Sequence, residues 1–237
     1  MTRLSVNVNK VATLRNARGA NNPNLVEVVR DCEKYGAEGI TVHPRNDERH
    51  ITLRDVYDIA SVVKTDFNIE GYPDKRFLKI IDDIAPEQVT LVPDPPEVLT
   101  SNRGWKKSDI KIDLKKIIKH IQSLGSKVVI FIDPEKEMLE YIKEMGADRV
   151  ELYTGTYALE YLKNREESIK DYIKVSNYAN EIGIGVNAGH DLDLNNLKYL
   201  KESIPFIYEV SIGHALICDA LYYGLEKTIV SYLNCLK

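Results

Sequence analysis

The sequence predicts an α/β fold, a single (β/α)8 barrel that occupies residues 1–237 as one domain. Eight short runs rich in β-branched residues alternate with longer segments whose apolar residues recur every three or four positions. Strands separated by helices must run parallel, because the helix crosses one face and returns the chain in the same direction. An open doubly wound sheet is the competing fold, but no glycine-rich dinucleotide loop follows the first run.

The β-branched runs give the expected strands in chain order: residues 4–9, 39–43, 67–70, 88–92, 127–133, 149–154, 183–187 and 207–212. The periodic segments give the expected helices: residues 25–35, 53–63, 75–84, 114–124, 136–145, 157–182, 194–202 and 214–236. Gly36, Gly125, Gly146 and Gly183 each fall between a helix and the next strand. A left-handed cap is needed there, and glycine adopts it most easily.

Composition limits the function classes. At 237 residues and 43% hydrophobic content the chain can bury one large core. A net charge of -4, with Lys and Arg spread along the chain, makes nucleic acid an unexpected partner. No apolar run approaches the roughly 18 residues of a membrane span, and no signal peptide is recognised. We therefore expect a cytoplasmic protein with three reduced cysteines, Cys32, Cys218 and Cys235.

One connection is much longer than the others. Residues 94–110 contain two adjacent prolines and the only tryptophan, Trp105. Long loops in compact domains are usually lids or disordered segments. Because this loop leaves the face on which barrels bind ligands, we expect a mobile lid, with a plain surface excursion as the alternative.

Polar side chains follow the expected strands at their carboxyl ends. Barrel closure aims all eight ends at one opening, so these side chains are expected to converge. They are Asn7, Asn9, Lys10, His43, Arg45, Glu70, Asp133, Glu151, Thr154, Asn187, His190, Ser211 and His214. Four of the five histidines lie in these loops: His43, His50, His190 and His214. A single such group is more often structural, but their convergence favours an active site.

A phosphate site is favoured over a metal site. The candidate metal ligands come from different strands, so no metal is expected. Gly189-His190 and Gly213-His214 place a glycine after each of the last two strands, where barrel enzymes commonly bind phosphate. Arg18 and Arg45 offer guanidinium groups to a second anion. Two anion sites indicate two phosphorylated small-molecule substrates.

Six segments match a known family of proteins. They are residues 6–19 (VNVNKVATLRNARG), 39–51 (GITVHPRNDERHI), 68–70 (NIE), 91–93 (LVP), 186–190 (VNAGH) and 212–215 (IGHA). Together these segments resemble pyridoxine 5′-phosphate synthases. The resemblance implies a (β/α)8 barrel that assembles into a homo-octamer. It also implies a transferase-class synthase that joins 3-amino-2-oxopropyl phosphate to 1-deoxy-D-xylulose 5-phosphate, releases phosphate and water, and needs neither metal nor organic cofactor.

The same resemblance assigns roles to residues. It implies that His43 and Glu70 are bases and that His190 is the proton donor. It places substrate contacts on Asn7, Arg18, Arg45, His50, Thr100, Gly213 and His214. Schiff-base formation and ring closure are successive proton transfers, each needing a group that takes and gives a proton near neutrality. Imidazoles, and a carboxylate tuned by burial, meet that need.

Two sites depart from the family pattern. Known members read Asn-x-Asp-His at the end of the first strand, whereas this chain reads Asn7-Val-Asn9-Lys10. Asp191 stands where the family commonly has glycine. Asn9, Lys10 and Asp191 are kept as candidate substrate-binding residues, and Lys10 is expected to contact a phosphate.

Two other functions stay open from the sequence. One is a barrel aldolase or isomerase that acts on one sugar phosphate, with Lys10 forming a Schiff base. The other is a non-catalytic phosphate-binding barrel. The presence of His43, Glu70 and His190 together argues against simple binding, which does not require three proton-transfer groups. The fold alone does not decide among these functions.

Overall fold

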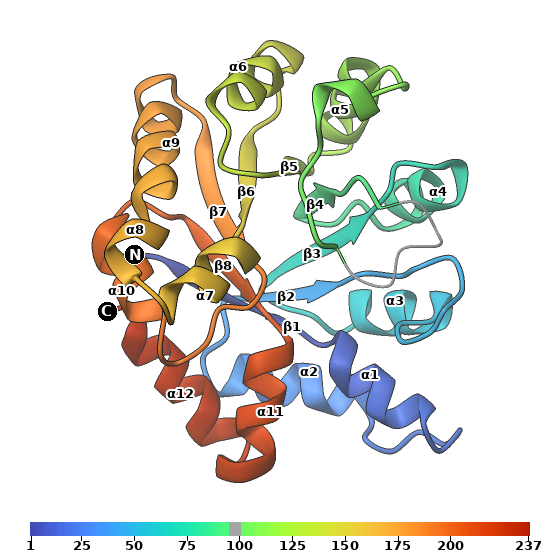
Figure 1. The fold of residues 1–237 in the computed structure, drawn as a ribbon. Coiled ribbons are helices and arrows are strands. Elements are labelled where there is room, and N and C mark those ends of the chain that lie inside the picture. Colours follow the sequence, from blue (N-terminus) through green and yellow to red (C-terminus); the bar gives the residue numbers. More distant parts are fainter. Residues whose placement is uncertain (95–100) are drawn as a thin grey trace.

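A closed barrel of parallel strands forms the centre of the molecule. The computed structural model describes residues 1–94 and 101–237. Each strand pairs with the next, and the last pairs with the first. The strands are β1 (Arg3–Asn7), β2 (Gly39–Val42), β3 (Asp66–Gly71), β4 (Gln88–Leu91), β5 (Lys127–Ile132), β6 (Arg149–Tyr153), β7 (Gly185–Gly189) and β8 (Glu209–Ile212). Helices surround the strands (Figure 1), so the predicted (β/α)8 fold is confirmed.

The helices of the described residues are α1 (Asn9–Asn16), α2 (Leu25–Lys34), α3 (Leu53–Ala60), α4 (Lys75–Ile84), α5 (Leu114–Ser123), α6 (Lys136–Met145), α7 (Gly155–Tyr161), α8 (Arg165–Ser168), α9 (Lys170–Glu181), α10 (Leu197–Ser203), α11 (His214–Tyr223) and α12 (Leu225–Cys235). A 3-10 turn, η1 (Lys107–Asp109), precedes α5. Several helices begin at a residue whose side chain accepts a hydrogen bond from a backbone N–H group that would otherwise be unpaired. Asn24, Asp74 and Asp113 cap α2, α4 and α5, and Thr52 with Asp55 forms a capping box on α3.

The turns between helices and strands use left-handed backbone, as predicted. Gly36, Gly125, Gly146 and Gly183 all have positive φ angles, from 71° to 106°. Ala85 ends α4 in the same conformation, with φ of 46°, although it carries a Cβ atom. These turns lie at the amino-terminal ends of the strands, away from the expected site.

The first helix was not predicted. β1 ends at Asn7, two residues earlier than expected, and α1 begins at Asn9. The Asn7 side chain accepts the Asn9 N–H at 3.0 Å, which turns the chain away from the sheet. Val11, Ala12 and Arg15 then bury one face of the new helix. Lys10 therefore lies in the first turn of α1, and the expectation that it lies at a strand end is wrong.

Several other boundaries differ from prediction, and three of them have a clear local cause. The expected helix 157–182 is three helices, with the Asn164 side chain capping α8. The expected helix 214–236 is interrupted at Gly224, which has φ of 81°. β7 begins at Gly185 and not at Gly183, because Gly183 is committed to the preceding turn.

The interior of the barrel is unusually polar. Barrels of this class usually fill that space with Val, Ile and Leu. Here the Ser5 and Thr41 hydroxyl groups lie 2.7 Å apart, and the Gln88 amide donates to Glu209 at 2.9 Å. Because β4 and β8 lie on opposite sides of the closed barrel, the Gln88 bond must cross the interior. Most buried apolar side chains are left to pack between the strands and the surrounding helices.

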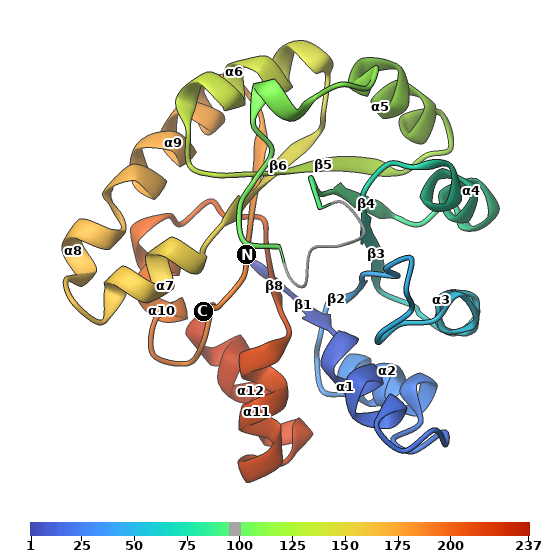
Figure 2. The same cartoon turned by 45° about the vertical axis from the view of Figure 1, so that its right-hand side comes forward.

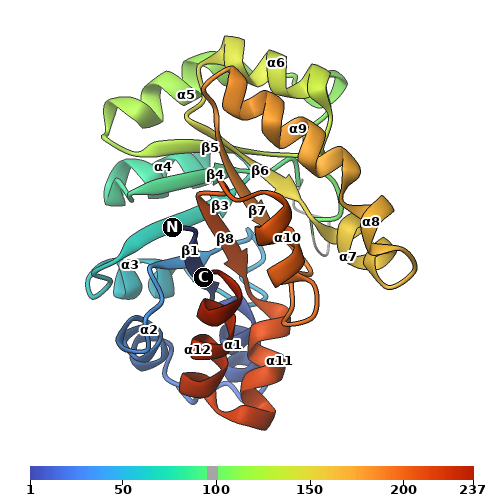
Figure 3. The same ribbon diagram turned by 90° about the vertical axis from the view of Figure 1, so that its left-hand side faces the viewer.

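The last helices of the chain lie beside the first ones. The two termini lie close together in Figures 1, 2 and 3. Figure 3 shows α11 and α12 as a pair beside α1 and α2, on the side of the barrel where the chain begins and ends. Within the described residues, no helix combines the length and the apolar character needed to cross a membrane.

Part of the expected lid is packed against the barrel. Residues 95–100, and with them Thr100, lie outside the described residues. Trp105 is 2% exposed, donates its indole N–H to the Leu91 carbonyl at 3.0 Å, and stacks on Tyr72 at 5.7 Å between ring centres. A Cβ atom on Gly104 would lie 2.2 Å from the Asp133 nitrogen, so only glycine allows this approach. The indole therefore fixes residues 104–105 over the end of β4.

Candidate active site

Four titratable side chains come together at the carboxyl-terminal mouth of the barrel. His43 follows β2, Glu70 stands near the end of β3, and His190 follows β7. Glu151 lies in the middle of β6 and faces inward. Their charges act on one another: His190 lowers the pKa of His43, and Glu70 raises the pKa of Glu151. The convergence predicted for His43, Glu70 and His190 is present in the structure.

His43 and Glu70 form the central pair. The Nδ1 atom of His43 lies 3.7 Å from the Oε2 atom of Glu70, and the side chains are only 9% and 13% exposed. Burial lowers the pKa of His43 well below its usual range, and the Arg45 charge adds to that effect. Burial also raises the pKa of Glu70 to about 8, although Arg45 opposes it. At neutral pH the contact therefore joins a neutral imidazole to a largely protonated carboxyl group rather than two ions.

The backbone of His43 is held by the segment after β1. The His43 N–H donates to the Asn9 Oδ1 atom at 3.0 Å, and the Asn9 N–H donates to the Asn7 Oδ1 atom at 3.0 Å. The two amide side chains thus connect the end of β1 to the end of β2. Asn9 uses its carbonyl oxygen to position His43, which leaves its amide N–H2 group as the part able to meet a substrate.

Arg45 lies beside this pair, in a buried ion pair. Its Nη2 atom is 2.9 Å from the Oδ2 atom of Asp94, and both side chains are less than a tenth exposed. The Ser101 hydroxyl donates to the same Asp94 oxygen. A small cavity of about 20 Å³ is lined by His43, Arg45, Asp94 and Tyr72, among others. Asp94 and Ser101 anchor both ends of the segment 95–100 next to Arg45.

His50 is fixed by α1. The Arg15 guanidinium contacts both carboxyl oxygens of Asp55 and the carbonyl of His50, and the Asn16 amide donates to that carbonyl at 2.8 Å. The His50 Nδ1 atom accepts the Ile51 N–H at 2.8 Å. Burial, followed by the Arg45 charge, lowers the pKa of His50 to about 4. The neutral ring therefore carries its proton on Nε2 and presents a hydrogen-bond donor.

The loop after β7 adopts a left-handed conformation. His190 has φ of 85° and Asp191 has φ of 56°. The Thr154 hydroxyl holds this loop: its oxygen lies 2.6 Å from the Gly189 carbonyl and 2.5 Å from the His190 carbonyl, which share its one proton. Aspartate tolerates a positive φ better than most residues, and glycine adopts it freely. This explains how Asp191 stands in the place of a glycine; its own side chain is exposed.

The His190 ring packs against two aromatic side chains that also contact each other. Its centre lies 5.6 Å from the Phe131 ring and 5.4 Å from the Tyr153 ring. Burial is the main cause that lowers the pKa of His190, while Asp191 and Asp94 oppose the change. The imidazole is therefore held in one orientation on the side of the mouth formed by β5 to β7.

Glu151, one of the side chains expected at the barrel opening, is a buried carboxyl group for which no catalytic role was predicted. It is 3% exposed, and burial raises its pKa well above the usual range, followed by the charges of Glu70 and Glu209. A Cβ atom on Gly189 would lie 2.1 Å from the Glu151 Oε1 atom. The glycine within VNAGH thus makes room for this carboxyl group. A neutral carboxyl in an apolar site can donate a hydrogen bond or a proton.

The start of α11 lies at the position where an anion site was expected. Gly213 precedes the helix and lies against Asn7, because a Cβ atom there would be 3.1 Å from the Asn7 Cβ atom. His214 opens the helix, is exposed, and places its Nε2 atom 3.7 Å from the Cys218 sulfur. Unpaired N–H groups at a helix start favour phosphate. This position agrees with the substrate contacts expected of Asn7, Gly213 and His214.

Three expected residues stand apart from the cluster. Lys10 is exposed on α1, and it lies near enough to His50 and His190 for its charge to add to the burial that lowers the pKa of both imidazoles. Arg18 is exposed beyond the end of α1, and it makes no side-chain hydrogen bond or ion pair to any residue that the structure describes. Thr100 lies outside the described residues. In the same described part, no three His, Cys, Asp or Glu side chains are grouped to hold a metal ion.

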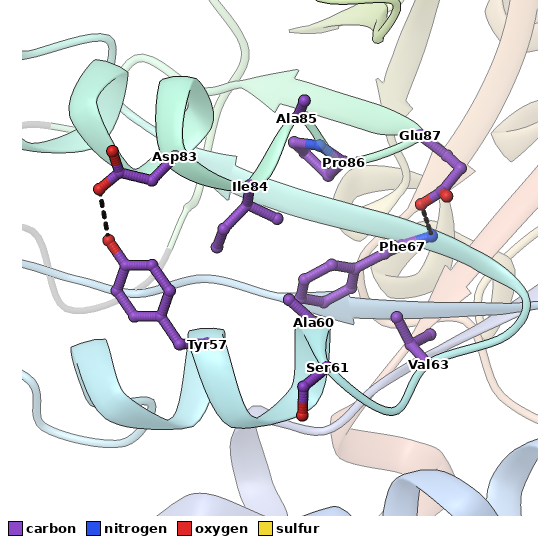
Figure 4. A pocket seen from close by; sticks show the side chains of 10 residues that line it. All are labelled: Tyr57, Ala60, Ser61, Val63, Phe67, Asp83, Ile84, Ala85, Pro86 and Glu87. Atoms are coloured by element: carbon purple, nitrogen blue, oxygen red, sulfur yellow. Dashed lines mark hydrogen bonds between the residues drawn. The ribbon is translucent and has the colours of Figure 1, made fainter.

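A larger hollow lies at the other end of the barrel. It has a volume of about 320 Å³ between α3 and α4, and Figure 4 shows Tyr57, Phe67 and Asp83 among the residues that line it. Phe67 is the second residue of β3, whereas Glu70 is the fifth. No imidazole lines this hollow. It is therefore separate from the titratable cluster.

A (β/α)8 barrel that gathers two imidazoles, two buried carboxyl groups and a guanidinium at its carboxyl-terminal mouth is an acid–base enzyme of the barrel class. The family model described as "Pyridoxal phosphate biosynthesis protein PdxJ" matches residues 4–237. The chain belongs to this family.

Relatives of similar length support the assignment. The chain is 56% identical over 237 residues to the pyridoxine 5′-phosphate synthase of Cytophaga hutchinsonii, with both chains fully covered. It is 53% identical over 232 residues to the protein of the same name from Porphyromonas gingivalis, with 98% of each chain covered.

Solved structures show the same fold in more distant proteins. A tryptophan synthase from M. tuberculosis superposes with a TM-score of 0.66 at 10% identity, covering 100% of this chain and 94% of that one. A thiamine phosphate pyrophosphorylase from Pyrococcus furiosus has a TM-score of 0.62 at 13% identity, with 99% and 95% covered. At such low identity these similarities concern the fold alone.

Proposed function

We propose that this protein is a pyridoxine 5′-phosphate synthase. It condenses 3-amino-2-oxopropyl phosphate with 1-deoxy-D-xylulose 5-phosphate and releases phosphate and water. The observation that carries the proposal is the 50–56% identity, along the whole chain, to proteins of that name. The cluster of His43, Glu70 and His190 adds chemical support, because ring closure needs groups that both take and give protons.

The proposed roles follow from the protonation states. His43 is neutral at physiological pH and is therefore ready to accept a proton. Glu70 has a pKa of about 8, which lets it hold a proton and release it within one catalytic cycle. His190 is proposed to be the donor that protonates a departing oxygen. Substrate imine formation begins with the amine of 3-amino-2-oxopropyl phosphate, so no protein amine is required.

Substrate binding is proposed to use the two anion sites. One is the start of α11, with Gly213 and His214, beside Asn7. The other is Arg45 with His50, whose Nδ1 atom accepts the Ile51 N–H and so leaves the ring proton on Nε2. Lys10, Arg18, Thr100 and Asp191 remain proposed contacts. The reaction is proposed to need neither metal nor organic cofactor.

The loop 94–110 is proposed to close over the bound substrates. The support is its attachment: Asp94 contacts Arg45, and Ser101 contacts Asp94. Ligand at Arg45 would therefore act directly on both ends of the segment. Limited proteolysis with and without both substrates tests this, with protection by ligand expected. Equal cleavage rates would contradict closure.

Assembly into a homo-octamer in the cytoplasm is also proposed. The support for assembly is a set of exposed apolar side chains on α11, Leu221, Tyr222 and Tyr223, which are 55–86% exposed. The three free cysteines suit a reducing compartment. Light scattering should give eight times the 27.0 kDa chain mass, and Leu221→Lys should lower it. A monomeric parent protein would contradict the octamer.

The experiment that tests the activity uses both candidate substrates. We expect the absorbance of the pyridine product and inorganic phosphate to appear together, and neither to appear when one substrate is left out. Turnover of the sugar phosphate alone would favour the aldolase or isomerase reading, which the named relatives do not support.

A further inference from the structure

A second buried polar cluster, built around one carboxyl group, lies at the amino-terminal end of the barrel, opposite the active site. Glu209, the first residue of β8, is 2% exposed. Its Oε1 atom accepts from the Gln88 amide at 2.9 Å, and Gln88 Oε1 accepts from Arg149 at 2.7 Å. The Asn187 amide donates to Gln88 at 3.2 Å and reaches Glu209 at 3.5 Å. We call Glu209, Gln88, Arg149 and Asn187 the closed-end network.

Asn187 connects this network to the active site. In the sheet register Asn187 is paired with Glu151 on one side and with Glu209 on the other. Its Oδ1 atom is buried and has no hydrogen-bond donor among the described residues. Buried acceptors are rarely left unpaired, so a proton-bearing group is expected beside this atom. A protonated Glu151 or Glu209 is such a group.

Charged side chains lie near Glu209 both on its solvent side and on its active-site side. Toward solvent, Arg149 on β6, Arg3 on β1 and Asp66 on β3 face it. Toward the active site lie Glu151 on β6 and Glu70 on β3. Burial raises the pKa of both, and the negative charge of Glu209 adds to that rise. The side chains that approach from β4 and β7 are the neutral Gln88 and Asn187.

We propose that Glu209 is a positioning residue that sets, through the barrel interior, the pH range in which Glu70 and Glu151 exchange protons with the substrates. The inference rests on the proposed synthase function. Three carboxyl groups inside one barrel cannot all ionise, because like charges in a dry interior repel strongly. When Glu209 is ionised, the two active-site carboxyl groups hold their protons more tightly.

The geometry gives Glu209 the means to ionise. Burial raises its pKa to about 7, while the Gln88 hydrogen bond and the Arg149 charge oppose that rise. The carboxyl group therefore changes charge within the physiological range. The charge of Glu209 should therefore change the pKa of Glu70, which is about 8.

The test is the pH–rate profile of product formation by Glu209→Gln. This variant keeps the shape and the acceptor for Gln88 but removes the charge. The acid limb of kcat/KM should move to lower pH by roughly 0.5–1 unit, the size expected for one charge acting across a protein interior. The control is Glu38→Gln, an exposed residue at the same end of the barrel, whose profile should match the parent. Superimposable profiles for Glu209→Gln and the parent would overturn the proposal.

A second variant keeps the test decisive if Glu209→Gln does not fold. Gln88→Met removes the hydrogen bond that favours the charged form of Glu209, without changing any charge directly. Its profile should move in the same direction, and an unmoved profile would count against the proposal. A parent protein that makes no product would instead refute the proposed function.

Urea unfolding gives a readout that needs no activity. Since the pKa of Glu209 is raised on folding, the stability that the neutral form contributes is present at low pH and is lost as pH rises through about 7. The parent should lose stability relative to Glu209→Gln between pH 5.5 and pH 8. A constant difference across that range would contradict the proposed titration.

Discussion

The Nδ1 atom of His43 lies 3.7 Å from the Oε2 atom of Glu70, between the ends of the neighbouring strands β2 and β3. Both groups are buried, and burial lowers the pKa of His43 and raises that of Glu70. The result is a neutral base beside a group that holds a proton until about pH 8. If His43 takes one proton from the substrate and Glu70 gives another to it, the pair carries no net charge after both transfers.

Replacing Glu70 by glutamine should remove proton transfer while keeping the shape of the site. Glu70→Gln keeps the size of the side chain and its neutral form but cannot take a proton. We expect kcat to fall by roughly 10²–10⁴ with little change in KM, the range for losing a general base. Steady-state kinetics measures both constants, with Glu38→Gln as the matched control. A variant within threefold of the parent would remove Glu70 from the mechanism.

Lys10 stands where members of the family have histidine, and its replacement tests what the lysine does. It lies on α1 facing His50 and His190, where a point charge can meet a phosphate. Lys10→Met should raise KM for 1-deoxy-D-xylulose 5-phosphate by roughly ten- to a hundredfold, with kcat less affected. Lys64→Met, an exposed position before the start of β3 at the other end of the barrel, is the control. Borohydride added during turnover should trap no adduct; a stable adduct mapped to Lys10 would support the aldolase-like mechanism.

The ion pair of Arg15 and Asp55 should stabilise both the fold and the position of His50. The two side chains are 10% and 11% exposed, and Arg15 also reaches the His50 carbonyl. Arg15→Met should cost about 3–5 kcal/mol in the free energy of unfolding, because it leaves a buried carboxylate without its partner. Arg54→Met, which breaks an exposed pair with Asp58, should cost less than about 1 kcal/mol. Equal losses in urea unfolding would contradict this assignment.

Chelation tests the proposed independence from metal. Exhaustive treatment with EDTA should leave the turnover rate unchanged, since the proposed proton transfers are assigned to side chains alone. A parallel sample with added Mg²⁺ or Zn²⁺ should show the same rate. Loss of activity that a divalent ion restores would show that the proposal omits a metal.

The sequence predicts the barrel because the alternation of strands and helices is repeated along the chain. It predicts the position of His43 and Glu70 because a residue at the end of a parallel strand must face the mouth. α1 escaped prediction, since an asparagine pair ends β1 early and the short helix that follows has a weak apolar face. Local periodicity does not reveal such a side-chain turn.

Glu209 and its network could not be predicted from the sequence. Gln88 and Glu209 are 121 residues apart and meet only because β4 and β8 face each other across the closed barrel. Each stands at the start of a strand, where a polar residue is usually exposed. The raised pKa of Glu70 could not be predicted either, because it depends on burial and on the charges of Arg45, Asp94 and Glu209, which are distant in the sequence. Only a signal such as the glycine at 189, facing Glu151, hints at a buried carboxyl group.

The pH dependence of pyridoxine 5′-phosphate formation tests the central claim most directly. If Glu70 acts as a base, only its ionised form is active, so kcat/KM should fall about tenfold for each pH unit below its pKa of about 8. The imidazoles of His43 and His50 stay neutral through that range and should add no further step. The account predicts a single ionisation near pH 8 that disappears in Glu70→Gln. A parent profile that is flat from pH 6 to pH 9, or a step that survives in the variant, would contradict it.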